Sequence, residues 1–301
     1  MILDILEGDG NMKPCKKEEQ MLDKTLEIFS KDGASKAYEY LILEKEHLNV
    51  YSSQLYNFLY CLASVTGNKS AALAWLKEAI IEKGYWYRPE VFEDEDLDII
   101  RNAPEFSEYK KISDEKYHIV YETANTLCSW EKVKADKLAL ILHGNQQNMH
   151  FGRDYWRFLE DEGWQVEYVQ SKIIDSYCLY RWNEKGETQL DKIVSKISWD
   201  KYSITALCGF SSGCNEILNT LTKANVKCNE IILVSPWTPI IDDCLNDVIN
   251  ALNNVRIKII CGGNDEDCLP HAKTLHKTAI ENSLNCNLEI INGCGHNYPE
   301  K

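Results

Sequence analysis

From residue 117 onward, short apolar runs alternate with longer amphipathic segments, and this alternation constrains the fold more than any other feature of the chain. Continuous Ile, Leu and Val runs predict strands covered on both faces, and the segments between them are long enough for helices. Strands are expected at 117–123, 137–143, 165–170, 203–209, 230–235, 256–261 and 288–291, and helices at 155–162, 187–196, 212–223, 242–252 and 270–283. The pattern predicts an α/β fold with a mostly parallel sheet flanked by helices.

The first 110 residues are different, because they show helical periodicity and almost no strand pattern. Residues 56–63 and 71–80 read as two helices joined by a tight turn at Gly67. This pair resembles a tetratricopeptide repeat, and Gly33, one repeat length of about 34 residues earlier, indicates a more degenerate copy. We expect a small all-α, tetratricopeptide-like helical-repeat domain over 1–113 and a second domain over 114–301.

Composition excludes several kinds of protein. The chain has 33 basic and 47 acidic residues, a formal charge of −14 and no local basic patch, which predicts no nucleic-acid partner. No apolar run is long enough for a membrane span, and the acidic start at residues 1–7 lacks the basic and apolar regions of a signal peptide. The 12 cysteines are scattered and form no Cys-x-x-Cys motif, so we expect reduced thiols and a cytoplasmic protein.

The segment Gly209-Phe210-Ser211-Ser212-Gly213 carries the clearest chemical signal. It lies between an apolar strand and an amphipathic helix, which is the context of a Gly-x-Ser-x-Gly nucleophile elbow. Glycines suit the tight turn because strand and helix backbones approach closely there. Ser211 then stands at the start of a helix, where unpaired backbone N–H groups favour a developing anion.

Three further segments resemble parts of the α/β-hydrolase superfamily. The turn at 143–145 (His-Gly-Asn) follows an apolar strand, as the oxyanion-hole loop of that superfamily does. Asp265 lies in a turn that resembles the acid-bearing turn, and His296 follows the last strand after a glycine turn. The order Ser211, Asp265, His296 matches the superfamily, and the resemblance covers about residues 115–301.

The resemblance implies an α/β-hydrolase fold and a serine hydrolase similar to small carboxylesterases. It implies Ser211 as nucleophile, His296 as base and Asp265 as acid, with the backbone amides of Asn145 and Ser212 as oxyanion donors. His143 is expected to orient the oxyanion loop. Carboxylates near Asp265 or after the preceding strand remain alternatives for the acid: Glu266, Asp267, Asp242 and Asp243.

Substrate and partners are less constrained. A small-molecule acyl ester or thioester is the expected substrate, while a peptidase or amidase would use the same triad. A non-enzymatic function is the main alternative: a catalytically idle hydrolase fold that binds a protein partner through its helical repeats. The helices could instead mediate self-association. Three aromatic side chains are expected either to line an acyl pocket or to pack internally: Tyr180, Trp182 and Trp237.

No cofactor is expected. Cysteines and histidines are frequent after residue 260, but only Cys268 and His271 have the close spacing of metal ligands, so we predict no metal site.

Overall fold

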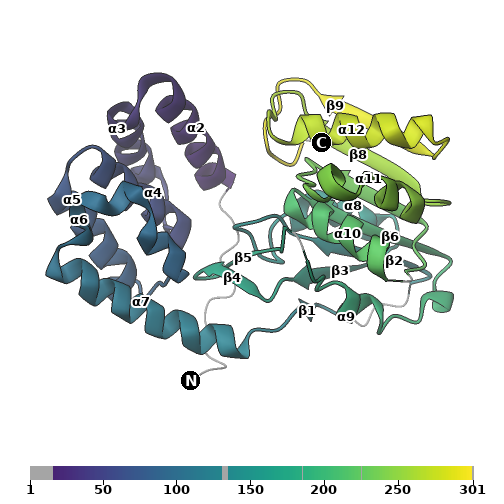
Figure 1. Ribbon diagram of the computed structural model, residues 1–301, viewed down its shortest axis with the longest axis horizontal. Helices are drawn as coiled ribbons and strands as arrows, with labels where there is room; N and C mark the ends of the chain where they lie inside the picture. Colours follow the sequence, from purple (N-terminus) through teal and green to yellow (C-terminus); the bar gives the residue numbers. More distant parts are fainter. Residues whose placement is uncertain (1–15, 131–134, 185, 225, 300–301) are drawn as a thin grey trace. The chain divides into compact units, whose positions relative to one another are not determined.

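A computed structural model describes residues 16–130, 135–184, 186–224 and 226–299 (Figure 1). The chain forms two compact units. The helical unit contains the chain up to Ala124 together with Ile174–Leu179, and the sheet unit contains the remaining residues. The sequence placed the boundary near residue 114, which lies inside the last long helix of the helical unit. No helix in the described ranges is both long and apolar enough to cross a membrane.

The helical unit begins with two helix pairs. Its main elements are α2 (Lys16–Asp32), α3 (Ala34–Glu44), α4 (Ser53–Val65), α5 (Lys69–Lys77), α6 (Asp98–Arg101) and α7 (Pro104–Thr123). The predicted helix-turn-helix around Gly67 is confirmed, and Gly33 separates α2 from α3 in the same way. Both glycines have positive φ, +84° and +81°, which a residue with a side chain rarely adopts. The likeness to tetratricopeptide repeats stays a prediction.

The strand predicted at 117–123 is wrong, because these residues form the last turns of α7. The run contains aromatic and β-branched residues, which favour strands locally. However, Pro104 starts a helix that continues through them, and Phe106, Tyr109 and Ser113 are buried at helical spacing. Burial of this helical face decides the conformation, whereas Ile119 and Tyr121 stay exposed.

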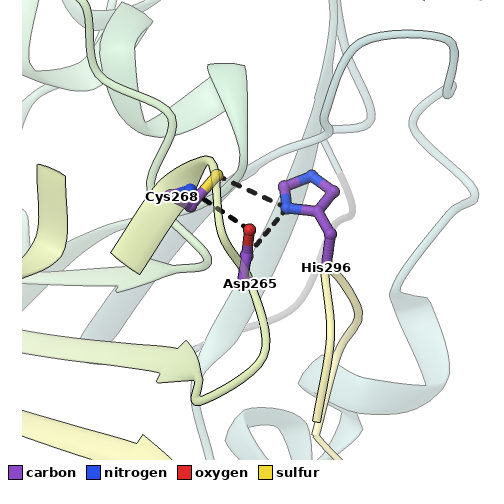
Figure 2. A group of neighbouring side chains, drawn as sticks. All are labelled: Asp265, Cys268 and His296. Carbon is purple, nitrogen blue, oxygen red and sulfur yellow. Dashed lines mark hydrogen bonds and ion pairs between the residues drawn. The ribbon is translucent and has the colours of Figure 1, made fainter. Parts of the chain in front are cut away.

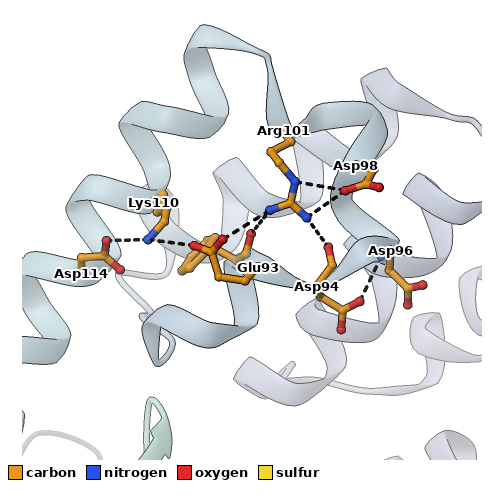
Figure 3. Close-up of polar contacts among 8 residues, drawn as sticks. Glu93, Asp94, Asp96, Asp98, Arg101, Lys110 and Asp114 are labelled. Atoms are coloured by element: carbon orange, nitrogen blue, oxygen red, sulfur yellow. Dashed lines mark hydrogen bonds and ion pairs between the residues drawn. The ribbon is translucent and has the colours of Figure 1, made fainter.

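Arg101 links the turn before α6 to the helices that follow (Figure 3). Its guanidinium donates to the carbonyl oxygens of Phe92 and Asp94, each at 2.6 Å, and to the carboxylate of Asp98. Lys110 on α7 forms an ion pair with Asp114 at 2.9 Å. Since exposed ion pairs contribute little, the two carbonyl contacts are the part of this network that fixes the chain path.

The segment 174–179 packs within the helical unit although it follows the third strand of the sheet in sequence. Arg88 donates to the Asp175 carboxylate at 3.0 Å, and the hydroxyls of Ser53 and Ser176 are 2.9 Å apart. The ring of Tyr177 stacks on Tyr85 at 4.8 Å. Sequence periodicity assigned all residues after 114 to one domain, since it cannot show that a short segment packs elsewhere.

The sheet unit contains a seven-stranded sheet, which confirms the predicted fold class. Its spatial order is β1-β3-β2-β6-β7-β8-β9, and every neighbouring pair is parallel except β1 with β3. The strands are β1 (Leu127–Cys128), β2 (Lys137–Leu142), β3 (Gln165–Gln170), β6 (Ile204–Phe210), β7 (Glu230–Val234), β8 (Arg256–Gly262) and β9 (Cys286–Ile291). Two short strands, β4 (Ile173–Ser176) and β5 (Leu179–Arg181), form a separate pair.

Both faces of this sheet are packed. Alternate strand residues such as Leu207 and Ile259 pack beneath the helices α10 (Ser212–Lys223), α11 (Ile240–Ala251) and α12 (Cys268–Glu281), which lie along one face (Figure 1). The intervening residues, such as Ala206, pack on the other face with Trp156 of α8 (Arg153–Asp161). A short helix, α9 (Asp191–Val194), occupies part of the range 187–196 predicted as helical. The carboxyl ends of β2, β6, β8 and β9 consequently meet at one edge.

Candidate active site

Ser211 lies at the tip of a sharp turn between β6 and α10. Its backbone has φ +52° and ψ −122°, a conformation that residues with side chains rarely adopt. The hydroxyl makes no helix-capping hydrogen bond, although serine is a common cap. The turn therefore presents the Ser211 hydroxyl away from the helix it precedes.

The glycines on either side of Ser211 are required by close backbone contacts. A Cβ on Gly213 would lie 2.5 Å from the carbonyl oxygen of His143, and one on Gly209 would lie 2.9 Å from the amide nitrogen of Cys214. Contacts this short force the backbone to move. The sequence prediction that these glycines allow close approach is confirmed.

His296 lies between Ser211 and Asp265. Its Nε2 is 3.0 Å from the Ser211 Oγ, and its Nδ1 is 2.9 Å from Asp265 Oδ2. Ser211 and Asp265 are 8% and 3% exposed, whereas the His296 side chain is 42% exposed. The structure thus brings together three residues that the sequence predicted to act together, each just past the carboxyl end of its strand.

Asp265 is held in its ionised form. Burial by itself would raise its pKa, but the hydrogen bond and charge of His296 and the amide of Cys268 outweigh burial and hold the pKa of Asp265 below its ordinary value. The amide of Cys268 donates to Asp265 Oδ1 at 3.1 Å. An ionised carboxylate at this position fixes the proton of His296 on Nδ1, which leaves Nε2 as the acceptor facing Ser211.

The loop of residues 143–145, which the sequence predicted to be the oxyanion loop, is fixed by buried hydrogen bonds. The Nδ1–H of His143 donates to the Gly144 carbonyl at 2.7 Å, and its Nε2 accepts from the amide of Ser171 at 3.2 Å. Burial lowers the pKa of His143 to about 4, so the ring is neutral at pH 7. The Trp182 indole N–H donates to the carbonyl of His143 at 2.7 Å. His143 accordingly orients the loop, as the sequence predicted.

The side chain of Asn145 connects the oxyanion loop to the elbow. Its Oδ1 accepts from the Ser212 hydroxyl at 2.8 Å and from the backbone N–H of Trp182 at 3.0 Å. Within the described ranges, neither the backbone N–H of Asn145 nor that of Ser212 has a hydrogen-bond acceptor. The loop also lies against Ser211, because a Cβ on Gly144 would be 3.1 Å from the Cβ of Ser211.

The predicted pocket residues have three different environments. Trp182 is 2% exposed and its indole N–H donates to the loop at His143, so of the two alternatives left open by the sequence the structure shows internal packing. Tyr180 lies beside the loop, since its amide donates to the Gln147 carbonyl at 2.8 Å. Trp237 is half-buried against the core under α10 to α12. A cavity of about 640 Å³ between α10 and α11 is lined by none of these aromatic residues and by none of Ser211, Asp265 and His296.

Tyr298 is a site residue that sequence reasoning missed. Its ring stacks on Phe210 at 4.3 Å, and Phe210 in turn lies 5.1 Å from the ring of His296. The Trp156 indole N–H is 3.4 Å from the Tyr298 hydroxyl. Tyr298 thus anchors the chain just after His296, and the only sequence signal was an aromatic residue two positions beyond the histidine.

The pair Cys268 and His271, which has metal-ligand spacing in the sequence, does not form a cluster. His271 Nδ1 instead accepts from the amide of Thr238 at 2.8 Å. Cys268 lies with Asp265 and His296, with one potential ligand atom of each residue within 4.8 Å of the others (Figure 2). The structure therefore shows a potential ligand set that the spacing did not predict.

The sheet order, the elbow and the strand-end positions of these residues define an α/β-hydrolase fold. Comparison with protein families agrees, since residues 17–120 match the model described as A/B hydrolase-like, N-terminal domain. The sheet unit therefore has an α/β-hydrolase fold, and residues 17–120 of the helical unit are similar to the N-terminal domain that this model describes. No curated protein was found to be similar to it.

Solved structures include one that is similar along almost the whole chain. It is an uncharacterized protein from Bacillus cereus ATCC 10987, with 26% identity over 93% of this chain and 94% of that chain, and a TM-score of 0.51. A Bacillus cereus carboxylesterase is 17% identical over 61% and 92% of the two chains, with a TM-score of 0.41. Zea mays acyl-protein thioesterase 2 is 15% identical over 58% and 92%, with a TM-score of 0.42.

Proposed function

We propose that the sheet unit is a serine hydrolase that cleaves a carboxylic ester or thioester through an acyl-enzyme intermediate. The observation that carries this proposal is the hydrogen-bonded series from Asp265 through His296 to Ser211, at 2.9 and 3.0 Å. A nucleophile within reach of a base that is itself oriented by a carboxylate is the arrangement this chemistry requires.

The proposed reaction follows from the positions of the protons. Ser211 Oγ attacks the acyl carbon while its proton passes to His296 Nε2, and Asp265 stabilises the resulting imidazolium. The backbone N–H groups of Asn145 and Ser212 donate to the carbonyl oxygen as it becomes negative. His296 then protonates the leaving alcohol or thiol, and a water molecule releases the acid by the reverse sequence.

Intact-mass analysis after exposure to a fluorophosphonate tests this proposal. We expect a single adduct on the wild type and on Ser195→Ala, a control at an exposed serine that follows the last residue of α9, and no adduct on Ser211→Ala. Ester turnover should fall by about 10³-fold or more in Ser211→Ala. A well-folded wild type without an adduct would contradict the proposal and would favour a non-catalytic role in which the helices bind a protein partner.

Activity assays with matched esters, thioesters and amides of one acyl group would then identify the leaving group. Alcohols and thiols are better leaving groups than amines, so we expect faster turnover of the esters and thioesters than of the amides. Amide turnover equal to ester turnover would instead indicate the peptidase or amidase alternative.

A further inference from the structure

Cys268 differs from the other buried cysteines of the sheet unit because its thiol faces the catalytic base proposed above. Its Sγ is 3.4 Å from His296 Nδ1, the same atom that is 2.9 Å from the Asp265 carboxylate (Figure 2). Figure 2 shows the side chains of Asp265 and Cys268 directed at one edge of the imidazole ring.

We propose that Asp265, Cys268 and His296 form a binding site for Zn²⁺ or a similar thiophilic divalent cation, and that occupation of this site reversibly inhibits the hydrolase. The proposal rests on the function proposed above for its inhibitory part, but not for the binding of the ion.

The ligand set fits zinc in both chemistry and size. One thiolate, one imidazole nitrogen and one carboxylate oxygen are ligands that Zn²⁺ accepts, whereas Mg²⁺ and Ca²⁺ prefer oxygen alone. Tetrahedral zinc with bonds of about 2.0–2.3 Å separates its ligand atoms by roughly 3.3–3.6 Å. The separations of 2.9 and 3.4 Å from His296 Nδ1 are within a few tenths of an ångström of this range, and all three ligand atoms lie within 4.8 Å of one another.

Charge and access are also compatible with an ion. Asp265 and Cys268 are 3% and 1% exposed, but the His296 side chain is 42% exposed and offers a route from solvent. Zinc binding forms a Zn–S bond and releases the thiol proton of Cys268 to water. The two positive charges of the ion are then balanced by one thiolate and one carboxylate, so the occupied cluster is neutral.

The ion would inhibit by moving a proton on the base. Neutral His296 carries one ring proton, which lies on Nδ1 when Nδ1 donates to Asp265. Coordination of Nδ1 to zinc places the ring proton on Nε2. Nε2 then no longer accepts the proton of Ser211, and Asp265 no longer orients the ring. Inhibition thus requires no contact between the ion and Ser211.

Co²⁺ binding to the full-length chain tests the site without relying on activity. We expect a thiolate-to-cobalt charge-transfer band and tetrahedral d–d bands in the wild type, in Ser211→Ala and in Cys244→Ser, which removes an exposed cysteine on α11. The bands should be lost, or need at least tenfold more Co²⁺, in Cys268→Ala. Cys268→Ser, which keeps the side-chain volume, gives the same test if the alanine variant does not fold.

His271→Asn separates this cluster from the pair suggested by sequence spacing. The variant keeps an acceptor near the Thr238 amide and should leave the cobalt spectrum unchanged. Cobalt bands that persist in both Cys268 variants, that disappear in His271→Asn, or that are absent from the wild type would each overturn the proposed site.

Inhibition is measured as ester turnover and fluorophosphonate labelling against Zn²⁺, with Mg²⁺ as a control cation. We expect Zn²⁺ to inhibit the wild type and Cys244→Ser equally. In the Cys268 variants, half-inhibition should require at least tenfold more Zn²⁺, with each variant compared with its own activity without metal. Equal inhibition of all variants would overturn the inhibitory role. A wild type that shows the cobalt bands but no labelling without metal would instead contradict the hydrolase function and leave the ion site supported.

Discussion

Replacing Asn145 by alanine removes a side-chain acceptor but keeps the backbone N–H proposed as an oxyanion donor. The Asn145 Oδ1 accepts two hydrogen bonds, from the Ser212 hydroxyl at 2.8 Å and from the Trp182 amide at 3.0 Å. The bond from Ser212 connects the two residues whose amides are the proposed donors, and the bond from Trp182 fixes the Asn145 side chain. We therefore predict that Asn145→Ala lowers kcat because the donors lose their relative position, although neither donor is deleted.

The size of the effect has an upper limit. Deleting one oxyanion donor costs about 2.7–4 kcal/mol of transition-state stabilisation, or about 10²–10³ in kcat. A donor that is kept but displaced by about 1 Å costs about 10²-fold. We expect kcat to fall by about 100-fold and KM to change by less than about threefold, because the donors act mainly on charge that develops in the transition state.

Asn229→Ala is a matched control. Its Oδ1 also accepts two hydrogen bonds, from the amide and the hydroxyl of Thr205 at 2.8 and 2.9 Å. Thr205 lies near the start of β6, about 20 Å along the strand from Ser211. Both variants lose two hydrogen bonds, worth about 1–3 kcal/mol of unfolding free energy in total. Only Asn145→Ala should lower kcat.

The assay is steady-state hydrolysis of a chromogenic ester, with urea unfolding to correct for the folded fraction. A double-mutant cycle with Ser212→Ala adds a second criterion, because the two side chains share one hydrogen bond. The double variant should lose less activity than the product of the single losses. The reasoning is refuted if Asn145→Ala keeps wild-type kcat, if Asn229→Ala loses as much, or if the cycle is additive.

Two further predictions concern stability. Because burial lowers the pKa of His143 from 6.5 to about 4, its neutral form stabilises the fold fully above pH 6.5, and this stability is lost as the pH falls towards 4. Urea unfolding should show the wild type losing about 3 kcal/mol more than His143→Gln between pH 7 and pH 4, and parallel losses would contradict this. The buried Glu216 carboxylate accepts from the amides of Gln189 and Leu190, so Glu216→Ala should lower the unfolding free energy by about 2–6 kcal/mol. Glu216→Gln keeps an acceptor and should cost less than about 1 kcal/mol of unfolding free energy at pH 7. Because burial raises the pKa of Glu216, the wild type should lose stability relative to this variant as the pH rises above 4.5. A relative loss of stability on lowering the pH would contradict this expectation.

Much of the sheet unit was predictable because its strands are encoded locally. The range 165–170 was predicted at the observed bounds of β3, and 212–223 at those of α10. Buried parallel strands need continuous apolar runs, and the helices between them need an amphipathic period, so both signals lie within a few consecutive residues. The same local reasoning failed at 117–123, where the packing of α7 overrides strand propensity.

The candidate site divides in the same way. The elbow, Asp265 and His296 could be proposed from motif and chain order, because strand ends in a parallel sheet converge on one edge. The Asn145 side-chain bonds, the support from Trp182 and the position of Cys268 beside His296 could not, since they join residues far apart in sequence. No local pattern records which side chains meet across different loops.

The sequence by itself determined the α/β architecture, the sharp turn at Ser211 and the order of the proposed triad, because each depends on neighbouring residues and on rules of strand connection. Only the tertiary structure decided that residues 174–179 pack with the helices, that Trp182 supports a loop instead of lining a pocket, and that a thiol faces the base. The physical reason is that these contacts depend on the directions of side chains from separate elements, which are fixed only when the whole core packs.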